Sequence, residues 1–359
     1  MKSMTWLRRL PGLPLYPVLA AAYPVIYLYA QNVQEAIAPA EIFIPLAICV
    51  GITVAVMAIV GGAHAEDKIT IGISYQNLAF PYVAALQKAA QNACKALDVS
   101  CIEADAVNDT NKELNNVESM MSKGINCLAF EAASLEASVA SINAANKKGI
   151  PVVQFNGKAG GGDYVTFVGS AQTDSGVKLG QFLEGLYKKL GKDKLRGIYL
   201  RGVAGQVTDI ARNDGLKNYL SSAGLGDKIE FVEQYADYDR GKGQSVTESI
   251  LTKDKNYDFI VANNDDMILG ALQTVNQFGL KIPMADVDGL PEALAAIKRG
   301  DLAATVFQDP EGQGGGGVWG CYLAVRKVNL PKDFLIPFTL VTPDNVNNFV
   351  AIADRVYVK

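Results

Sequence analysis

The sequence predicts an α/β protein made of two doubly wound lobes of parallel sheet, preceded by hydrophobic leader spans. From Lys68 onward, short apolar segments rich in Ile, Val and Phe alternate with longer amphipathic segments. That alternation is typical of βαβ units, whose helices connect parallel strands. The expected strands outnumber those of an ordinary single sheet, so two lobes are predicted. The cleft between the lobes is the expected ligand site.

In the first half, each apolar segment predicts a strand and each amphipathic segment predicts a helix. Pro81 favours a helix start, because proline fits the first helical turn. Asp109 is expected to cap the second helix, and a capping box from Thr110 to Glu113 is the alternative. Strands are expected over residues 69–75, 101–106, 126–132, 150–156 and 164–169, and helices over 81–97, from Asp109 onward, 134–148 and 173–191.

The second half repeats the same pattern. Strands are expected over residues 197–202, 229–237, 257–263, 285–289 and 303–309, with helices near 207–223, 242–253, 265–278 and 290–299. Gly312 and Gly314 to Gly317 lack the Lys-Ser/Thr of a P-loop, so they predict a loosely formed helix start rather than a phosphate site.

The composition of the 359-residue chain excludes several classes of function. A formal net charge of −4, without a long Lys/Arg cluster, argues against nucleic acid as the main partner. The one histidine, His64, lies in the leader. The body therefore cannot hold a Ser-His-Asp triad, a Cys-His pair or a multi-histidine metal site. We expect no metal, no cofactor and no enzymatic reaction.

The five cysteines are Cys49, Cys94, Cys101, Cys127 and Cys321. None forms a CxxC pair, which argues against a zinc ribbon or a thioredoxin-type site. Cys94 lies near the end of an expected helix and Cys101 begins the next strand. Either a disulfide joins them in an oxidising compartment, or both are small buried hydrophobic residues.

Residues 1–65 form a hydrophobic leader that has two interpretations. Residues 10–30 and 42–62 are uncharged, and the second stretch is long enough to span a bilayer. Ala63-His64-Ala65 then matches a signal-peptidase site, which favours export of the body. Two full spans, retained as an anchor, would instead return residue 66 to the cytoplasm, since Arg8 and Arg9 favour a cytoplasmic N-terminus. Whether residues 1–41 belong to the native protein stays open.

Polar side chains follow or end several expected segments of the second half. They are Arg212, Tyr238, Asn264, Asp288 and Gln308. Ligands of open α/β sheets bind beyond the carboxyl ends of the strands, so these side chains are expected to converge on one pocket. Guanidinium, carboxylate and carboxamide groups bond neighbouring hydroxyls, and an aromatic ring covers an apolar sugar face. The set predicts a site for one small polyhydroxylated molecule.

A series of motifs in the body resembles one known family. In chain order they are FPY at 80–82, NKEL at 111–114, GIPVV at 149–153, ARxxG at 211–215, ADYDR at 236–240, NNDDM at 263–267 and DG at 288–289. In this order and spacing the chain resembles the ribose-binding-protein-like periplasmic sugar-binding proteins, the solute receptors of ABC importers. The resemblance covers essentially all of residues 67–345. Repressors of the same fold carry a helix-turn-helix where this chain has apolar spans, which argues against DNA binding.

The resemblance implies a type I periplasmic binding fold whose lobes close on a ligand. The implied N-terminal lobe is residues 67–170 plus 309–337, and the C-terminal lobe is residues 171–308 plus 338–359. A three-strand hinge is implied near residues 170, 308 and 338.

The resemblance also implies ligand contacts. Arg212 matches the arginine that binds sugar hydroxyls, Tyr238 a pocket aromatic, and Tyr82 an aromatic that stacks on the ligand. Asn264, Asp288 and Gln308 match the polar set on the strand ends.

The first lobe departs from the family pattern. Phe80 stands where the family usually has Asn, and Val83 replaces a second pocket aromatic. Asn156-Gly157 replaces the Asp-Arg of ribose-type receptors, and Glu131 stands where Asn often follows the third strand. A lost cation and a gained carboxylate change what this lobe selects. We therefore expect another monosaccharide, or a polyol such as a cyclitol, rather than ribose.

Several of these residues also have a purely structural interpretation. Arg212 would be an exposed partner of Asp209 or Asp214, Tyr82 and Tyr238 would be core aromatics, and Asp288-Gly289 would be only a turn. Glu131 is expected to be exposed or salt-bridged, unless it faces an amino group of the ligand. At the start of helix 265–278, we expect Asp265 to provide the N-cap and Asn264 to face the ligand.

The expected function is a periplasmic, monomeric solute receptor that delivers a monosaccharide or polyol to an ABC permease in the inner membrane. The alternative is a membrane-tethered sensor that passes ligand occupancy to a signalling partner. An enzyme would need carboxylate chemistry between Glu131 and Asp288, for which the spacing gives no support.

Overall fold

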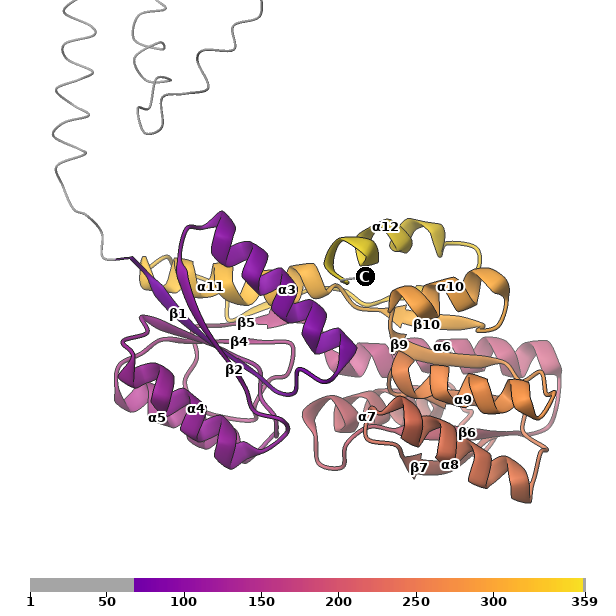
Figure 1. The fold of residues 1–359 in the computed structure, drawn as a ribbon. Coiled ribbons are helices and arrows are strands. Elements are labelled where there is room, and N and C mark those ends of the chain that lie inside the picture. The colour runs from indigo at the N-terminus through magenta and orange to yellow at the C-terminus, as the bar shows by residue number, and fades with distance from the viewer. Residues whose placement is uncertain (1–67, 358–359) are drawn as a thin grey trace, which may run out of the picture. The chain divides into compact units, whose positions relative to one another are not determined.

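The computed structural model describes residues 68–357, and within that range the strands form two six-stranded sheets (Figure 1). The leader and both of its interpretations lie outside the described residues. The first sheet contains β1 (Thr70–Tyr75), β2 (Ser100–Asp105), β3 (Cys127–Phe130), β4 (Val152–Phe155), β5 (Thr166–Gly169) and β11 (Asp333–Leu335). The second contains β6 (Leu195–Arg201), β7 (Ile229–Tyr235), β8 (Phe259–Ala262), β9 (Met284–Asp288), β10 (Ala304–Phe307) and β12 (Thr339–Val341).

Helices cover both faces of the first sheet. They are α3 (Pro81–Ala96), α4 (Thr110–Ser122), α5 (Val139–Lys147), the π-helix η2 (Glu311–Gly315) and α11 (Gly316–Val325). Leu86 of α3 and Val318 of α11 pack against Ile73 and Phe155 on one face. Helices α4 and α5 bury their apolar residues on the other face. This double covering explains why the four-residue strands are wholly apolar or buried rather than alternating.

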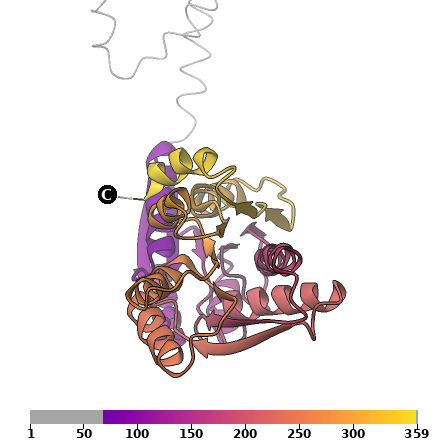
Figure 2. The same cartoon turned by 90° about the vertical axis from the view of Figure 1, so that its right-hand side faces the viewer.

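The second lobe has the same three layers (Figure 2). Its helices are α6 (Gln172–Leu190), α7 (Val207–Ser222), α8 (Arg240–Lys253), α9 (Asp265–Gln277), α10 (Pro291–Arg299) and α12 (Asn347–Val356). Leu183 of α6 and Leu216 of α7 pack on one face of the sheet. Residues of α8, α9, α10 and α12 pack on the other face. The predicted fold of two doubly wound lobes is therefore confirmed.

The strand order reverses direction once in each sheet. The first sheet runs β11-β5-β4-β3-β1-β2 and the second runs β12-β10-β9-β8-β6-β7. The chain starts at an inner strand, adds one neighbour on one side and then continues on the other. The reversal point beside β1 or β6 is where open α/β sheets bind ligands. One strand departs from the expected parallel arrangement, because β12 pairs with β10 in the antiparallel direction.

The chain passes between the two sheets three times. It leaves the first sheet after β5 and reaches β6 through α6, returns after β10 through η2 and α11 to β11, and crosses again from β11 to β12. Helix α12 then contacts both lobes. Val356 packs on Ala85 and Ala89 of α3, while Val346 and Ala353 belong to the core of the second lobe.

The structure corrects details of the expected elements. Helix α5 begins at Val139 rather than at residue 134, because Ser134 and Ser138 form a local turn in which the Ser138 hydroxyl accepts the Ser134 amide. Asp109 caps α4, since its carboxylate accepts hydrogen bonds from the main-chain N–H groups of Asn111 and Lys112. Glu113, the capping-box alternative, is buried and accepts the Ala133 amide instead.

The glycine-rich segment begins a helix, as expected, and has a packing role. In η2, a Cβ on Gly314 would lie 2.3 Å from the carbonyl oxygen of Leu86 in α3. Only glycine lets the two helices approach this closely. The segment therefore holds the crossing after β10 against the first lobe.

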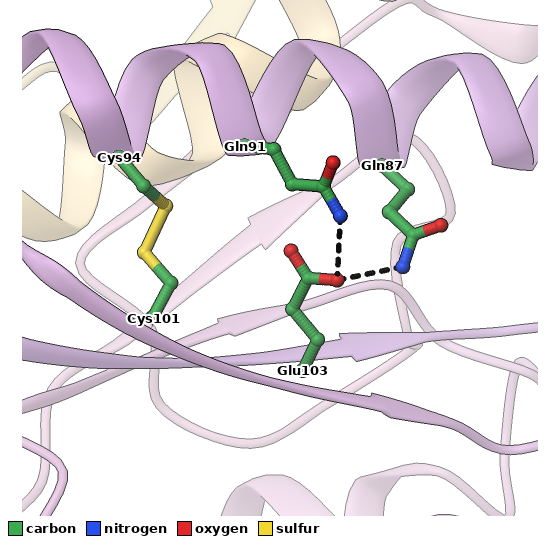
Figure 3. Close-up of a disulfide and its surroundings, with 5 residues drawn as sticks. All are labelled: Gln87, Gln91, Cys94, Cys101 and Glu103. Carbon is green, nitrogen blue, oxygen red and sulfur yellow. Dashed lines mark hydrogen bonds between the residues drawn. A yellow bond between two sulfur atoms is a disulfide. The ribbon is translucent and has the colours of Figure 1, made fainter.

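Two disulfides hold the first lobe together. Cys94 in α3 pairs with Cys101 in β2, which decides between the two interpretations offered by the sequence (Figure 3). Beside it, Glu103 accepts hydrogen bonds from the side-chain amides of Gln87 and Gln91. The second disulfide, which the sequence did not predict, joins Cys127 in β3 to Cys321 in α11.

Candidate ligand-binding site

A cavity of about 40 Å³ lies between the two lobes, beyond the carboxyl ends of the strands. Its walls come from both lobes, which belong to the same compact unit of the chain. The lining residues are Gln76, Phe80, Tyr82, Val83, Asn156, Gln206, Thr208, Arg212, Tyr238, Asn264, Asp288 and Gln308. The space holds only a few water-sized molecules. Entry of a larger ligand therefore requires the lobes to separate.

Arg212 lies in the first turns of α7 and points into the cavity with only 3% of its surface exposed. Its Nε donates to Gln172 Oε1 over 3.2 Å, and Nη1 donates to the carbonyl oxygen of Asn263. Nη2 lies 3.5 Å from Asp288 Oδ1. Helices α6 and α7 approach closely at Gly176, where a Cβ would lie 2.1 Å from the Arg212 carbonyl oxygen. The close contact brings Gln172 within reach of the guanidinium.

Neither of the expected salt-bridge partners contacts Arg212. Asp209 instead binds Arg201, over 3.0 and 2.6 Å, and accepts the side-chain amide of Asn263 over 2.7 Å. The Tyr199 hydroxyl also donates to Asn263. This buried network fixes the Asn263 backbone, whose carbonyl oxygen orients Arg212. The exposed-residue interpretation of Arg212 is thus wrong.

The predicted N-cap of α9 is wrong. Asn264, not Asp265, is the N-cap, because its Oδ1 accepts the Met267 amide over 3.0 Å. Asn264 nevertheless lines the cavity, with its Oδ1 occupied by the helix. Asp265 is buried behind the pocket, where it accepts the Leu290 amide and the Thr305 hydroxyl. A side chain at this position can therefore cap the helix and line the pocket at once.

Asp288 and Gln308 end neighbouring strands and meet in the cavity. Gln308 Nε2 donates to Asp288 Oδ1 over 2.5 Å. Gln308 Oε1 has no hydrogen-bond partner among residues 68–357. The backbone of Asp288 has a φ of 141°, a conformation that side-chain-bearing residues rarely adopt. Strain of this kind is typical of functional positions, which favours the pocket role of Asp288 over a simple turn.

Three aromatic side chains surround the polar groups. The rings of Phe80 in the first lobe and Tyr238 in the second meet edge to face across the cleft, with centroids 5.6 Å apart. The Tyr238 hydroxyl lies 2.9 Å from the Thr208 hydroxyl. The buried hydroxyl of Tyr82 lacks a partner in the described part of the chain. All three aromatics line the cavity, and Tyr82 and Tyr238 also belong to the buried cores.

Glu131 does not line the cavity and is neither exposed nor salt-bridged in the way the sequence suggested. It is fully buried just after β3. Its carboxylate accepts hydrogen bonds from the main-chain N–H of Gln76 over 3.2 Å and from the side-chain amide of Asn156 over 2.5 Å. Asn156 is the residue that reaches the cavity. The structure therefore places Glu131 one layer behind the wall.

Sequence reasoning missed three polar wall residues. Gln76 directly follows β1, so the rule that strand ends carry ligand groups, applied to the first half, would have found it. Gln206 precedes α7, and its Oε1 accepts the Thr208 hydroxyl over 2.9 Å. The Nε2 of Gln206 is buried and has no partner within residues 68–357. No pattern in the sequence marks Gln206 or Thr208.

Several buried acids lie at or behind the pocket. Burial raises the pKa of Glu131 to about 7, and hydrogen bonds from Asn156 and Gln76 lower it only in part. Burial likewise raises the pKa of Asp286 to about 7 and that of Asp288 to about 8, the latter against the opposing charge of Arg212. Asp265, which pairs with Asp286, also has a raised pKa because of its burial.

These raised pKa values predict that the protein becomes less stable as the pH rises. Between about pH 4 and pH 8 the folded state holds protons that the unfolded state has released, so the free energy of unfolding falls through this range. Asp286→Asn removes one such group and is expected to raise the free energy of unfolding at pH 8 by on the order of 2 kcal/mol. Urea unfolding at pH 5 and pH 8 measures the change.

The exposed residue Asp193 supplies the control for this prediction. Asp193→Asn is expected to leave the pH dependence as it is in the wild type. An Asp286→Asn protein whose stability falls with pH as steeply as the wild type would contradict the assignment.

The described residues contain no helix of sufficient length and apolarity to cross a bilayer. They also hold no cluster of three or more His, Cys, Asp or Glu side chains suited to a metal ion.

Residues 71–327 match the periplasmic binding protein domain. The chain belongs to the periplasmic binding protein family. Its relatives place it among the sugar-binding solute receptors of ABC transporters, which are binding proteins and not enzymes. This agrees with the resemblance drawn from the motifs and with the expectation that no reaction is catalysed.

Three relatives illustrate the range of this family. The ribose import binding protein of Haemophilus influenzae is 32% identical to this binding protein over 71% of the chain and 84% of its own length. The D-allose-binding periplasmic protein of Escherichia coli is 29% identical over 68% of the chain and 80% of its own length. An ABC transporter solute-binding protein from Bacillus halodurans, solved with bound myo-inositol, is 30% identical with a TM-score of 0.73, covering 80% of this chain and 99% of the other.

Proposed function

We propose that this binding protein is the exported receptor of an ABC importer and captures one monosaccharide or polyol between its lobes. The observation that carries the proposal is the cavity wall. Asn156 Oδ1, Gln206 Nε2 and Gln308 Oε1 are buried there without partners among the described residues. Each unpaired buried polar group costs about 1–3 kcal/mol. A ligand with several hydroxyls supplies both donors and acceptors to such groups.

The aromatic side chains support a sugar-like ligand over a small anion. Phe80, Tyr82 and Tyr238 surround the polar groups and present apolar faces to the same space. Rings of this kind cover the C–H faces of a sugar or cyclitol. The one cation of the wall, Arg212, already directs its donors at Gln172, the Asn263 carbonyl oxygen and Asp288, so it is not free to bind a small anion.

Closure of the lobes supports capture. The three passages between the sheets, near residues 170, 308 and 338, are proposed as the hinge between a lobe of residues 67–170 plus 309–337 and a lobe of residues 171–308 plus 338–359. Opening must separate Phe80 from Tyr238 and move Val356 relative to α3. When the lobes close on the ligand, its hydrogen bonds form in a space from which water is excluded, where each bond contributes most to binding.

The choice of ligand follows from the first lobe. Ribose-type receptors carry Asp-Arg where this chain has Asn156-Gly157, so ribose is not proposed. Glu131 stays out of the wall, which leaves Asn156 as the polar group that β3 and β4 offer to the cavity. The myo-inositol held by the Bacillus halodurans relative makes a cyclitol the first candidate to test.

Export is supported by the two disulfides, since such bonds form and persist in oxidising compartments. The proposed mature protein begins at Glu66, is monomeric and docks on a permease of the inner membrane. Mass spectrometry of the protein recovered from the periplasm of an expression host measures the start directly. A protein that keeps residues 1–65 would favour the tethered sensor instead.

The test of binding is a thermal-shift screen of that exported protein. The panel contains myo-inositol, ribose, galactose and allose. A ligand present at 100 times its dissociation constant adds about 2.7 kcal/mol to the free energy of unfolding, which is measurable as a higher melting temperature. If no sugar or polyol in the panel or in a wider set shifts melting, the proposed function fails.

A further inference from the structure

Asn156 presents only one end of its amide to the cavity. It follows β4 with a φ of 52°, a left-handed conformation that asparagine tolerates better than most residues. The residue is 5% exposed, and its Nδ2 donates to Glu131 Oε1 over 2.5 Å. Oδ1 has no partner among the described residues and belongs to a cavity-lining side chain. The free end of the amide is therefore a hydrogen-bond acceptor.

The carboxylate of Glu131 decides that orientation. An ionised carboxylate only accepts hydrogen bonds, so it holds the NH₂ end of Asn156 and turns the carbonyl end toward the cavity. Glu131 is itself fixed from two sides. Its Oε2 accepts a hydrogen bond from the main-chain N–H of Gln76 over 3.2 Å, and its own main-chain N–H donates to the carbonyl oxygen of Ser74 over 3.0 Å. With no exposed surface, it cannot turn to bind a ligand directly.

We propose that Glu131 is a positioning residue for ligand selection: it locks Asn156 as an acceptor, so the ligand must bring a hydroxyl or a protonated amine to this point. The inference rests on the proposed function and narrows its ligand class to neutral polyols and amino-substituted polyols. A ligand group that only accepts hydrogen bonds, such as a ring oxygen or a carboxylate, is rejected at Asn156. The negative charge behind the amide strengthens its carbonyl as an acceptor.

The orientation responds to protonation of Glu131. A protonated Glu131 carries an O–H that donates to Asn156 Oδ1, which turns the amide over and presents its NH₂ end to the ligand. The acids that face Glu131 are Asp105 and Glu113, and both raise its pKa together with its burial. The buried Tyr75 hydroxyl also interacts electrostatically with Glu131. Because the pKa of Glu131 is about 7, affinity is expected to fall as the pH decreases from 8 to 5.5.

The test is a double-mutant cycle on the exported protein, with myo-inositol as the probe and the dissociation constant measured by calorimetry. Glu131→Gln replaces the acceptor by an amide that can donate to Asn156 Oδ1. It is expected to weaken binding at pH 8 by at least 10-fold and to reduce the loss of affinity at pH 5.5, leaving only the part that protonation of Asp288 causes. Asn156→Ala is expected to weaken binding by a similar factor. In the Asn156→Ala background, Glu131→Gln is expected to have no further effect.

Two outcomes overturn the inference. In the first, Glu131→Gln weakens binding by the same factor in the wild type and in the Asn156→Ala background, as a general structural role of Glu131 would. The other is a Glu131→Gln protein that keeps the affinity and pH profile of the wild type. If Glu131→Gln does not fold, wild type and Asn156→Ala are compared from pH 8 to 5.5. The same relative loss in both then overturns it. Failure of the wild type to bind any polyol removes the proposed function along with this inference, whereas binding with an uncoupled cycle removes the inference alone.

Discussion

Arg212→Ala is expected to weaken ligand binding by at least 100-fold, about 3 kcal/mol or more. The guanidinium is buried and is shared between the Asn263 carbonyl, Gln172 and Asp288. Alanine leaves these groups unpaired and removes the charge that lowers the pKa of Asp288. Asp288, whose pKa is about 8 even beside Arg212, would then hold its proton more firmly, and the wall would lose the guanidinium donors.

Two further variants make the Arg212 result interpretable. Arg212→Lys keeps the positive charge without the planar fork, so we expect an intermediate loss of affinity. Asn218 lies exposed on the same helix, and Asn218→Ala is expected to bind as the wild type does. Calorimetry with the best polyol of the thermal-shift screen gives the dissociation constants. Unchanged affinity in Arg212→Ala would remove Arg212 from the site.

Removing the disulfide between Cys127 and Cys321 is expected to lower the free energy of unfolding by about 5 kcal/mol, within a chain-entropy description. The two cysteines are 194 residues apart in sequence, so the bond closes a loop that contains most of the second lobe, from α6 to β10. It also attaches α11, which follows the second passage between the lobes, to β3. Reduction is expected to act mainly by giving the unfolded chain more conformational freedom, and to disturb the folded core much less.

The other disulfide provides the matched comparison. Cys94 and Cys101 are only seven residues apart, and the same description gives about 2–3 kcal/mol for so short a loop. Urea unfolding of the wild type, Cys127→Ala with Cys321→Ala, and Cys94→Ala with Cys101→Ala measures both contributions. Equal losses for the two pairs would show that loop length does not govern this protein's stability.

The elements that the sequence predicted best are those with a strong local signal. Helix α3 begins at Pro81 as expected, and the apolar segments before Asn263 and Gln308 are strands. An element that was missed lacks such a signal. Strand β11 is three exposed residues at a sheet edge. Its structure depends on pairing with β5, which is a contact with a distant part of the chain.

The candidate site was predicted in part for the same reason. Arg212, Tyr238, Asn264, Asp288 and Gln308 each stand at or beyond a strand end or at a helix start, and all five line the cavity. Glu131 also follows a strand, yet it lies behind the wall because Asn156 from the next strand covers it. Gln206 was missed because nothing in its local sequence separates it from an ordinary helix flank.

By itself the sequence determined the alternation of strands and helices, the two-lobed class and the polar residues placed at the carboxyl ends of the strands. Those features depend on residue periodicity and on residue type, which are local. Only the tertiary structure decided the Cys127–Cys321 pairing, the position of Glu131 and the end of each amide that is hydrogen-bonded within the protein. Asn156 is oriented by a carboxylate 25 residues away in sequence, and Asn264 by its own helix. Hydrogen-bond partners of this kind exist only once the strands lie side by side.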